Sequence, residues 1–276
     1  MEIEKGFKVF FSHKDRVFMG IKERRFTRDK FEFAITMLAC AVVLYMLVSI
    51  FYLYVAVGQS WNLVVSALFD SRVIGAVVIS VSSSLIVGGL AVAAAVPCAY
   101  LLAYKDFRGK GILETFLIDL PQTFPPVTEG LVYLLMLGPL GLAYTYTAVI
   151  IAKFYVSAPF TISFTTRSFK GIKESGLDTI ARSLGAKTRD VLVRVLLPLS
   201  GRDMLAGFSL TWARAMGELA ATLVFAGAIP WSTEIIPTLV YLTAAETPQV
   251  AIAASVIAET LSIAALLSFR WVVRRR

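Results

Sequence analysis

The stretch Leu177-Asp178-Thr179-Ile180-Ala181-Arg182-Ser183-Leu184-Gly185-Ala186 decides how this chain is interpreted. It lies in a polar gap between two very hydrophobic segments. Its apolar residues recur at helical spacing and predict a short amphipathic helix, whose apolar face holds Leu177, Ile180, Ala181 and Leu184. Gly185 predicts the end of that helix, because glycine tolerates the left-handed conformation of a C-terminal cap. Such a helix has no core of its own. We expect it to lie on lipid or to dock into a partner, with Asp178 and Arg182 at the rim of the contact.

The segments on both sides of this stretch are too apolar for a soluble domain. Hydrophobic residues make up 57% of the chain and charged residues 17%, whereas soluble domains carry about 45–50% and about 25%. Residues 33–57 contain no charge, and about 20 apolar residues suffice to cross a bilayer. We therefore predict an all-α integral membrane protein. Its six transmembrane helices are expected at residues 33–57, 73–104, 121–137, 143–163, 203–227 and 246–269.

Basic residues gather on alternate connections between these spans. Residues 1–32, 105–120, 164–202 and 270–276 hold 9, 3, 8 and 4 Lys or Arg, whereas the opposite connections hold only Arg72. The positive-inside rule then predicts that both termini face the cytoplasm, as does the helix at 177–184, in a multi-pass protein of the cell membrane. Residues 1–32 are expected to form a basic tail on anionic lipid rather than a nucleic-acid-binding arm. Residues 270–276 form a basic C-terminus.

Prolines interrupt two of the predicted spans. Pro97 removes a helical hydrogen bond within residues 73–104, so we expect a kink or a broken end there. Pro121, Pro125 and Pro126 exclude a regular helix at the start of 121–137, close to Glu129. Irregular backbone at membrane depth is tolerated against protein or a water-filled cavity. This stretch therefore either lines a transport pathway or forms an entry turn at the membrane surface. Residues 58–72, 105–120, 138–142 and 228–245 are expected to be loops or turns.

Ionisable residues inside the spans are candidates for function. Arg214 lies in mid-span, where insertion costs about 2.5–3.5 kcal/mol, so it should face protein or water and have a partner. Glu218 lies one turn later at the spacing of a helix pair. The two residues either line an anion route, with Thr211 and Gly217 on the same wall, or form a structural ion pair. Lys153 is a second positive candidate, although a long lysine can reach the membrane surface.

The chain carries no residue pattern for catalysis or metal binding. There is no Gly-x-x-x-x-Gly-Lys-Ser/Thr phosphate loop, so ATP hydrolysis is not expected on this chain. The histidine, His13, lies in the basic tail, and Cys40 and Cys98 lie in or beside apolar runs without ligand spacing. We predict that the protein is not an enzyme and binds no metal or cofactor of its own.

Three stretches together resemble the permease subunits of ABC importers. The cytoplasmic coupling segment of that family has the pattern Glu-Ala-Ala, three residues, Gly, and then a stretch that ends in Leu-Pro. This chain keeps Ala181, Leu184-Gly185-Ala186 and Leu197-Pro198 at that spacing, but has Thr179 and Ile180 at the Glu and first Ala. Residues 212–218 and the run from Leu120-Pro121 to Gly130 are similar to the oxyanion branch, the molybdate/tungstate and sulfate permeases.

The resemblance implies a type I ABC importer permease fold, with a permease core at residues 73–269 and a coupling segment at 168–202. It implies a homodimer around the pathway, two ABC ATPase subunits that hold ATP and Mg²⁺, and an extracytoplasmic oxyanion-binding protein. The expected substrate is molybdate or tungstate, and sulfate or thiosulfate is the alternative. A secondary transporter driven by an ion gradient would show two halves with matched interrupted spans. No convincing repeat relates residues 33–137 to 143–269.

Overall fold

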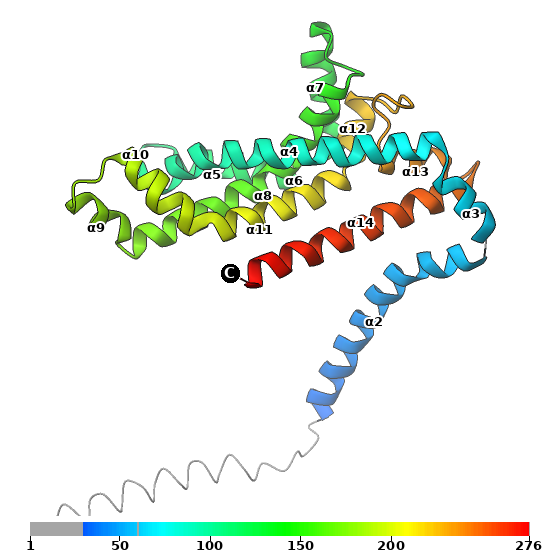
Figure 1. The fold of residues 1–276 in the computed structure, drawn as a ribbon, viewed down its shortest axis with the longest axis horizontal. Coiled ribbons are helices and arrows are strands. Elements are labelled where there is room, and N and C mark those ends of the chain that lie inside the picture. Colours follow the sequence, from blue (N-terminus) through cyan, green and yellow to red (C-terminus); the bar gives the residue numbers. More distant parts are fainter. Residues whose placement is uncertain (1–29, 60, 276) are drawn as a thin grey trace, which may run out of the picture. The chain divides into compact units, whose positions relative to one another are not determined.

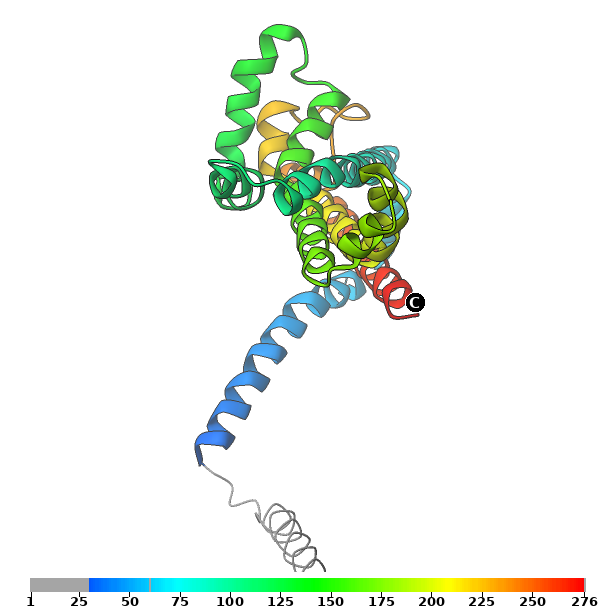
Figure 2. The same cartoon turned by 90° about the vertical axis from the view of Figure 1, so that its left-hand side faces the viewer.

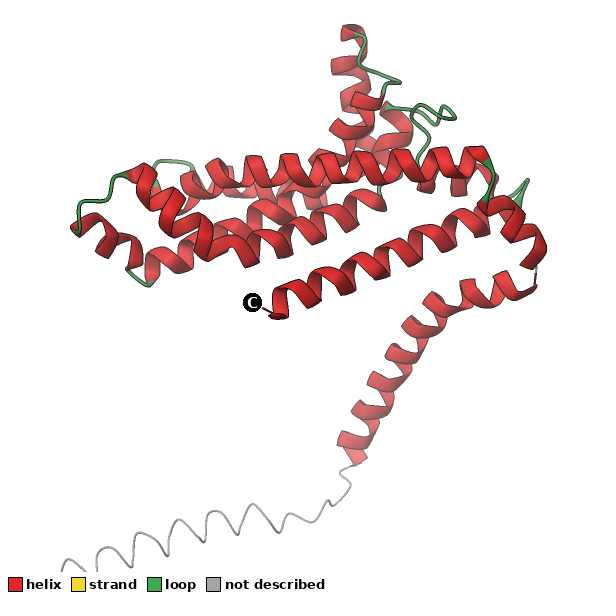
Figure 3. Ribbon diagram, in the orientation of Figure 1, coloured by secondary structure: helices red, strands yellow, loops and turns green. Residues whose placement is uncertain are grey.

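The computed structural model describes residues 30–59 and 61–275, so most of the predicted tail at 1–32 lies outside the described part. Figure 3 shows that the described residues form helices joined by loops. The chain divides into two compact units, Met1–Tyr52 and Leu53–Arg276. Of the first unit, the structure describes the greater part of helix α2 (Lys30–Gln59). The end of α2 and all later helices belong to the second unit.

Three long helices form the centre of the second unit. They are α4 (Ser71–Tyr104), α8 (Tyr146–Glu174) and α11 (Leu197–Met216), and they lie side by side in both views (Figures 1 and 2). Small residues allow this approach, because a side chain at Gly207 of α11 would meet the Cα atom of Thr161 of α8 at 2.8 Å. Several small residues in the middle of α4 are buried in this bundle, namely Ser80, Ser83, Ser84, Gly88 and Ala91.

Shorter helices pack around this centre. Helices α7 (Pro126–Leu137) and α12 (Ala220–Phe225) pack closely, because Gly130 leaves room for the Ala221 carbonyl, which a Cβ would approach to 2.7 Å. Helix α14 (Pro248–Arg275) packs against α3 (Trp61–Leu68), α11 and α13 (Ile236–Thr243). A short 3₁₀ helix, η2 (Gly138–Leu140), separates α7 from α8.

Two π-helical turns occur in the described part, and each ends two residues before a proline. The first, η1 (Thr115–Asp119), lies between α5 (Lys110–Glu114) and α6 (Leu120–Thr123) and precedes Pro121. The second, η3 (Leu192–Leu196), follows α10 (Thr188–Val191) and precedes Pro198. A proline lacks the N–H and its ring crowds the carbonyl one turn earlier, so a wider turn before it relieves that clash.

Several predicted loops are wrong, because they contain helices. Residues 58–72 include α3, residues 105–120 include α5 and η1, and residues 228–245 include α13. Helix α3, for example, is short and buries Val64 and Ala67 beside Ala253 of α14. Of the two outcomes expected at Pro97, a kink or a broken end, the broken end is wrong, because α4 continues through Pro97 to Tyr104. Helix α8 continues past the predicted boundary at Ser163 to Glu174.

The six-span expectation is not confirmed in the described residues. Four helices are long and apolar enough to cross a membrane, at Glu32–Gly58, Ser71–Tyr104, Tyr146–Glu174 and Pro248–Leu267. The predicted span 121–137 is interrupted at Phe124 and Pro125, and the predicted span 203–227 is interrupted at Gly217–Leu219 between α11 and α12. The protein is therefore a multi-pass, all-helical membrane protein in which two of the expected spans are broken.

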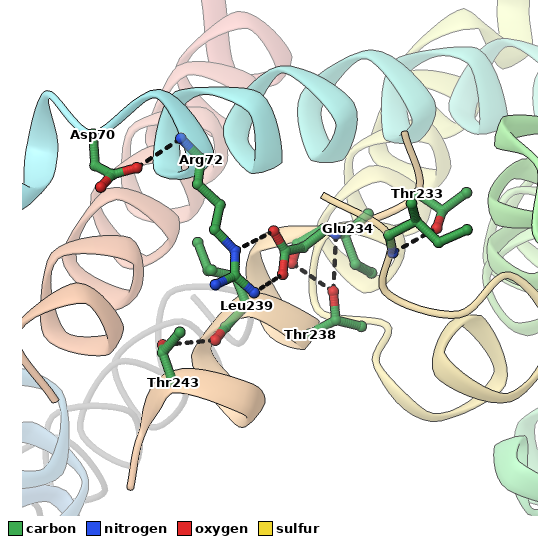
Figure 4. Close-up of polar contacts among 9 residues, drawn as sticks. Asp70, Arg72, Thr233, Glu234, Thr238, Leu239 and Thr243 are labelled. Atoms are coloured by element: carbon green, nitrogen blue, oxygen red, sulfur yellow. Dashed lines mark hydrogen bonds and ion pairs between the residues drawn. The ribbon is translucent and has the colours of Figure 1, made fainter. Parts of the chain in front are cut away.

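A buried ion pair fixes the connection between α12 and α13 to the start of α4 (Figure 4). Arg72 donates from Nε to Glu234 Oε2 at 2.8 Å and from Nη2 to Glu234 Oε1 at 2.6 Å. Glu234 is fully buried, and the Asp70 carboxylate caps α4 by accepting the Arg72 backbone N–H at 2.7 Å. Ser80 of α4 adds a second link, because its Oγ accepts the N–H of Ile236 at 2.8 Å.

Candidate functional site

The predicted amphipathic helix is present as α9 (Leu177–Ser183), between α8 and α10. Its C-terminus is closed by two backbone hydrogen bonds, from Gly185 N–H to Arg182 O at 2.9 Å and from Ala186 N–H to Ala181 O at 3.0 Å. Gly185 has φ of +89°, the left-handed conformation that this cap requires. The sequence-based expectation that Gly185 ends the helix is confirmed.

The apolar residues of α9 divide between two sides. Leu177, Ile180 and Leu184 are 45%, 57% and 83% exposed and form an outward surface, here called the α9 ridge. Ala181 instead faces the protein, where it packs with Ala186 onto a buried cluster from the ends of α4 and α8, including Ala103 and Phe169. Exposed leucine and isoleucine side chains at the end of a helix bundle are available for a partner's groove.

Asp178 and Arg182 of α9 differ in exposure, although the sequence predicted both at the rim of a contact with a partner. Arg182 is exposed, as expected, and its Nη1 lies 3.3 Å from Thr188 Oγ1. Asp178 is only 5% exposed and faces the protein, so the expectation that it lies at the rim is wrong. The helix is short and Ala181 is small, which brings Asp178 close to the end of α4. Thr179 is exposed on α9, and Pro198 lies in the first turn of α11.

Charged contacts join the helix ends around α9. Lys173 of α8 donates from Nζ to the Ala103 carbonyl of α4 at 2.9 Å, and Lys170 pairs with Glu114 of α5 at 2.7 Å. On the loop after α4, the Lys110 ammonium donates to Asp106 at 3.0 Å and lowers the pKa of that carboxyl. The first two contacts connect the end of α8, directly before α9, to the ends of α4 and α5.

Arg214 and Glu218 form the ion pair that their spacing predicts. Arg214 Nη1 lies 2.8 Å from Glu218 Oε2, and the two side chains are 34% and 2% exposed. Glu218 Oε1 also accepts the N–H of Ala221 at 3.0 Å, which caps α12. The pair therefore spans the break between α11 and α12. Gly217 lies at the break and lines a 630 Å³ pocket between α11, α13 and α14.

Thr211 and Glu129, two other predicted pathway residues, have different polar partners. Thr211 is fully buried between α8 and α11, where its Oγ1 lies 2.7 Å from Thr161 Oγ1 and donates to Ser157 O at 2.9 Å. Glu129 is 7% exposed in the first turn of α7 and interacts with Tyr133. In the described residues these side chains contribute to helix packing.

Lys153 does not reach the membrane surface, although the sequence left that possibility open. It is fully buried on α8, and its Nζ donates to Ser83 Oγ at 2.8 Å and to Ser84 Oγ at 3.1 Å on α4. No carboxylate in the described part lies within ion-pair distance of it. Glu218 is the carboxylate whose charge acts on it from beyond that distance. A buried ammonium without a close countercharge is expensive at membrane depth, which marks Lys153 as a candidate functional residue.

Comparison with known proteins identifies the family. Residues 91–276 match the model of the family described as "Binding-protein-dependent transport system inner membrane component". The chain belongs to this family. It is thus the membrane permease component of an ABC importer, and permeases of this kind are not themselves enzymes. The structural comparison agrees: the chain shares its fold with the permease of a bacterial importer of alginate, with a TM-score of 0.66, 15% identity, and coverage of 92% of this chain and 99% of that one.

Curated relatives of the permease include a molybdate/tungstate permease, WtpB, of Thermococcus kodakarensis, which is 30% identical over 72% of this chain and 79% of its own length. The molybdenum permease ModB of Mycobacterium tuberculosis is 34% identical over 66% and 73% of the two chains. A probable molybdenum permease of Haloferax volcanii is 39% identical over 50% of this chain and 53% of its own length.

Sequence reasoning missed two polar clusters of the permease. The Arg72–Glu234 pair joins residues 162 positions apart, and the Lys153 cluster joins residues about 70 apart. Arg72 is the single basic residue on the connection at 58–72, and this was a signal for the first cluster. The serines at positions 80, 83 and 84, which share one helical face, were a signal for the second.

Proposed function

We propose that this chain is the permease subunit of an ATP-driven importer of a tetrahedral oxyanion, and its similarity to WtpB and ModB supports molybdate or tungstate as the substrate. The α9 ridge carries the proposal, because three large apolar side chains at one end of the bundle have no partner within the described chain. A groove on a soluble ATPase would bury them. ATP and Mg²⁺ would be held there, on two copies of the ATPase below a homodimer of this chain.

The proposed orientation places α9, both termini and the ATPase in the cytoplasm. The positive-inside rule supports it, because Lys and Arg gather on the connection that contains α9 and on the other connections predicted to lie on the same side of the membrane. An extracytoplasmic binding protein would deliver the anion on the other side. A solved importer of this fold was studied with its periplasmic protein bound, which supports this kind of partner. ATP binding would draw the two α9 helices together and turn the pathway outward, and hydrolysis would return it inward.

Arg214 is the residue that we assign to the anion route. A dianion cannot cross hydrocarbon and needs positive charge or donors on its way. Arg214 is one-third exposed beside the break at Gly217, while its partner Glu218 is buried. Because Glu218 holds the guanidinium only from one side, the exposed side of Arg214 can meet an anion.

The experiment is uptake into proteoliposomes that contain the purified complex of permease, ATPase and binding protein. We expect ATP-dependent uptake of labelled molybdate or tungstate that excess unlabelled tungstate suppresses more strongly than excess sulfate does. Suppression by sulfate at equal concentration would assign the sulfate alternative. Uptake driven by an ion gradient without ATP would refute the proposal in favour of secondary transport.

Two variants test the site assignments in the same assay. Leu184→Asp, on the α9 ridge, should abolish the stimulation of ATPase by substrate, whereas Arg108→Asp, an exposed site on the loop after α4, should not. Arg214→Gln combined with Glu218→Gln removes both charges without leaving one buried alone. We expect folded complex with reduced uptake. Unchanged uptake would remove Arg214 from the anion route.

A further inference from the structure

Two buried polar atoms, one at the end of α4 and one on α9, have no hydrogen-bond partner among the described residues. They are the hydroxyl oxygen of Tyr104, the last residue of α4, and Oδ1 of Asp178, in the first turn of α9. Asp178 and Arg182 are the charged residues whose fields act on the Tyr104 hydroxyl. A phenol is a donor and a carboxylate oxygen is an acceptor, so the two atoms are complementary.

Unsatisfied buried polar atoms cost free energy, and native proteins keep few of them. Here a donor and an acceptor are both unsatisfied and lie near each other. No ion pair in the described residues includes Asp178, and the nearby Arg182 is directed to Thr188 instead. A conformation in which the Tyr104 hydroxyl donates to Asp178 would satisfy both atoms at once.

Tyr104, at the end of α4, is held by more contacts than the outer face of α9. The Tyr104 ring stacks on Tyr100 with centroids 5.2 Å apart, and the Lys173 ammonium lies 5.6 Å from its centroid. Helix α9 has its inner face on the protein through Ala181, while its ridge is uncovered. A load applied to the ridge would therefore move α9 toward Tyr104 rather than the reverse.

We propose that Tyr104 and Asp178 are positioning residues of the coupling step. When the α9 ridge seats in the ATPase, α9 shifts inward and Asp178 accepts a hydrogen bond from the Tyr104 hydroxyl. This contact ties α9 to the C-terminal end of α4, so that movement of the ATPase is passed to a membrane-spanning helix. The inference rests on the proposed function, since it requires a docked ATPase.

The test is a double-mutant cycle on the complete reconstituted complex. Tyr104→Phe removes the donor and keeps the ring, Asp178→Leu removes the acceptor, and Asp178→Asn keeps an acceptor oxygen. The measured quantity is oxyanion uptake per ATP hydrolysed, which a purely structural loss of protein does not change. Tyr100→Phe, which alters the neighbouring stacked ring, is the matched control.

We expect Tyr104→Phe and Asp178→Leu each to lower uptake per ATP about fivefold, the shift that one hydrogen bond of ordinary net strength produces. The double variant should be no worse than either single one, and Asp178→Asn should retain most of the coupling. Independent losses that multiply in the double variant, or wild-type coupling in Tyr104→Phe, would overturn the proposal. If the wild-type complex itself shows no ATP-driven uptake, the proposed function fails instead.

Discussion

Arg72→Ala removes the partner of a carboxylate that has no access to water. Glu234 is fully buried, while the Arg72 side chain is 36% exposed and donates twice to it, at 2.6 and 2.8 Å. Loss of one partner of a buried ion pair costs about 3–5 kcal/mol, because the other charge is left uncompensated. Water can partly replace the exposed arginine, so we expect a loss of about 2–3 kcal/mol in the free energy of unfolding.

Thermal denaturation of the purified permease in detergent measures this loss. A decrease of about 2–3 kcal/mol corresponds to a decrease in Tm of roughly 5–10 °C for a chain of this size. Adding Glu234→Gln to Arg72→Ala removes the unpaired carboxylate charge and should restore at least half of the lost Tm. Arg108→Ala, at an exposed arginine without an ion pair in the described residues, is the control and should leave Tm unchanged. An equal Tm for Arg72→Ala and wild type would refute the reasoning, as would a double variant that is less stable than Arg72→Ala.

Three further predictions follow from single contacts. Gly207→Ala should lower the free energy of unfolding by about 1–3 kcal/mol, and with it Tm, because the added Cβ would meet Thr161 Cα at 2.8 Å. Gly201→Ala is the control and should not lower Tm, because there is open space around Gly201. Gly185→Val should cost about 1–2 kcal/mol, because it places a β-branched residue at φ of +89°, and circular dichroism with thermal denaturation would detect this. Lys153→Met should leave Tm within a few degrees of wild type, since an apolar side chain of similar length avoids desolvation, yet uptake should fall if the charge serves transport. Equal uptake would assign Lys153 no such role.

The sequence predicted the coupling region well because its signals are local. The spacing of Leu177, Ile180 and Leu184 and the glycine at 185 determine a helix and its end within ten residues. The same pattern could not predict that Asp178 faces the protein. Its burial depends on how closely the end of α4 approaches α9, and small residues of α4, far away in the sequence, determine that distance.

The number of spans was less predictable, for a physical reason. One side of α11 packs against α4, α8 and α14, and polar residues on that side, such as Thr211, are satisfied by neighbouring helices. Its hydropathy therefore falls below that of a lipid-facing span. Short helices such as α3 were missed because their sequence alone resembles that of a loop. They are recognisable as helices only where a few of their apolar residues pack against a longer helix. The Arg72–Glu234 pair joins positions 162 residues apart, so the isolated arginine could be noticed in the sequence but its partner could not be identified.

The most direct test of the account is a photo-cross-linking amino acid at Leu184, on the α9 ridge, in membranes that contain the whole transport complex. The same amino acid at Leu199, an exposed position on α11, is the control for contact with lipid. The account predicts that position 184 cross-links to an ATP-hydrolysing subunit, with a yield that changes when ATP is bound. Cross-links from position 184 to lipid alone, equal to those from position 199, would contradict it.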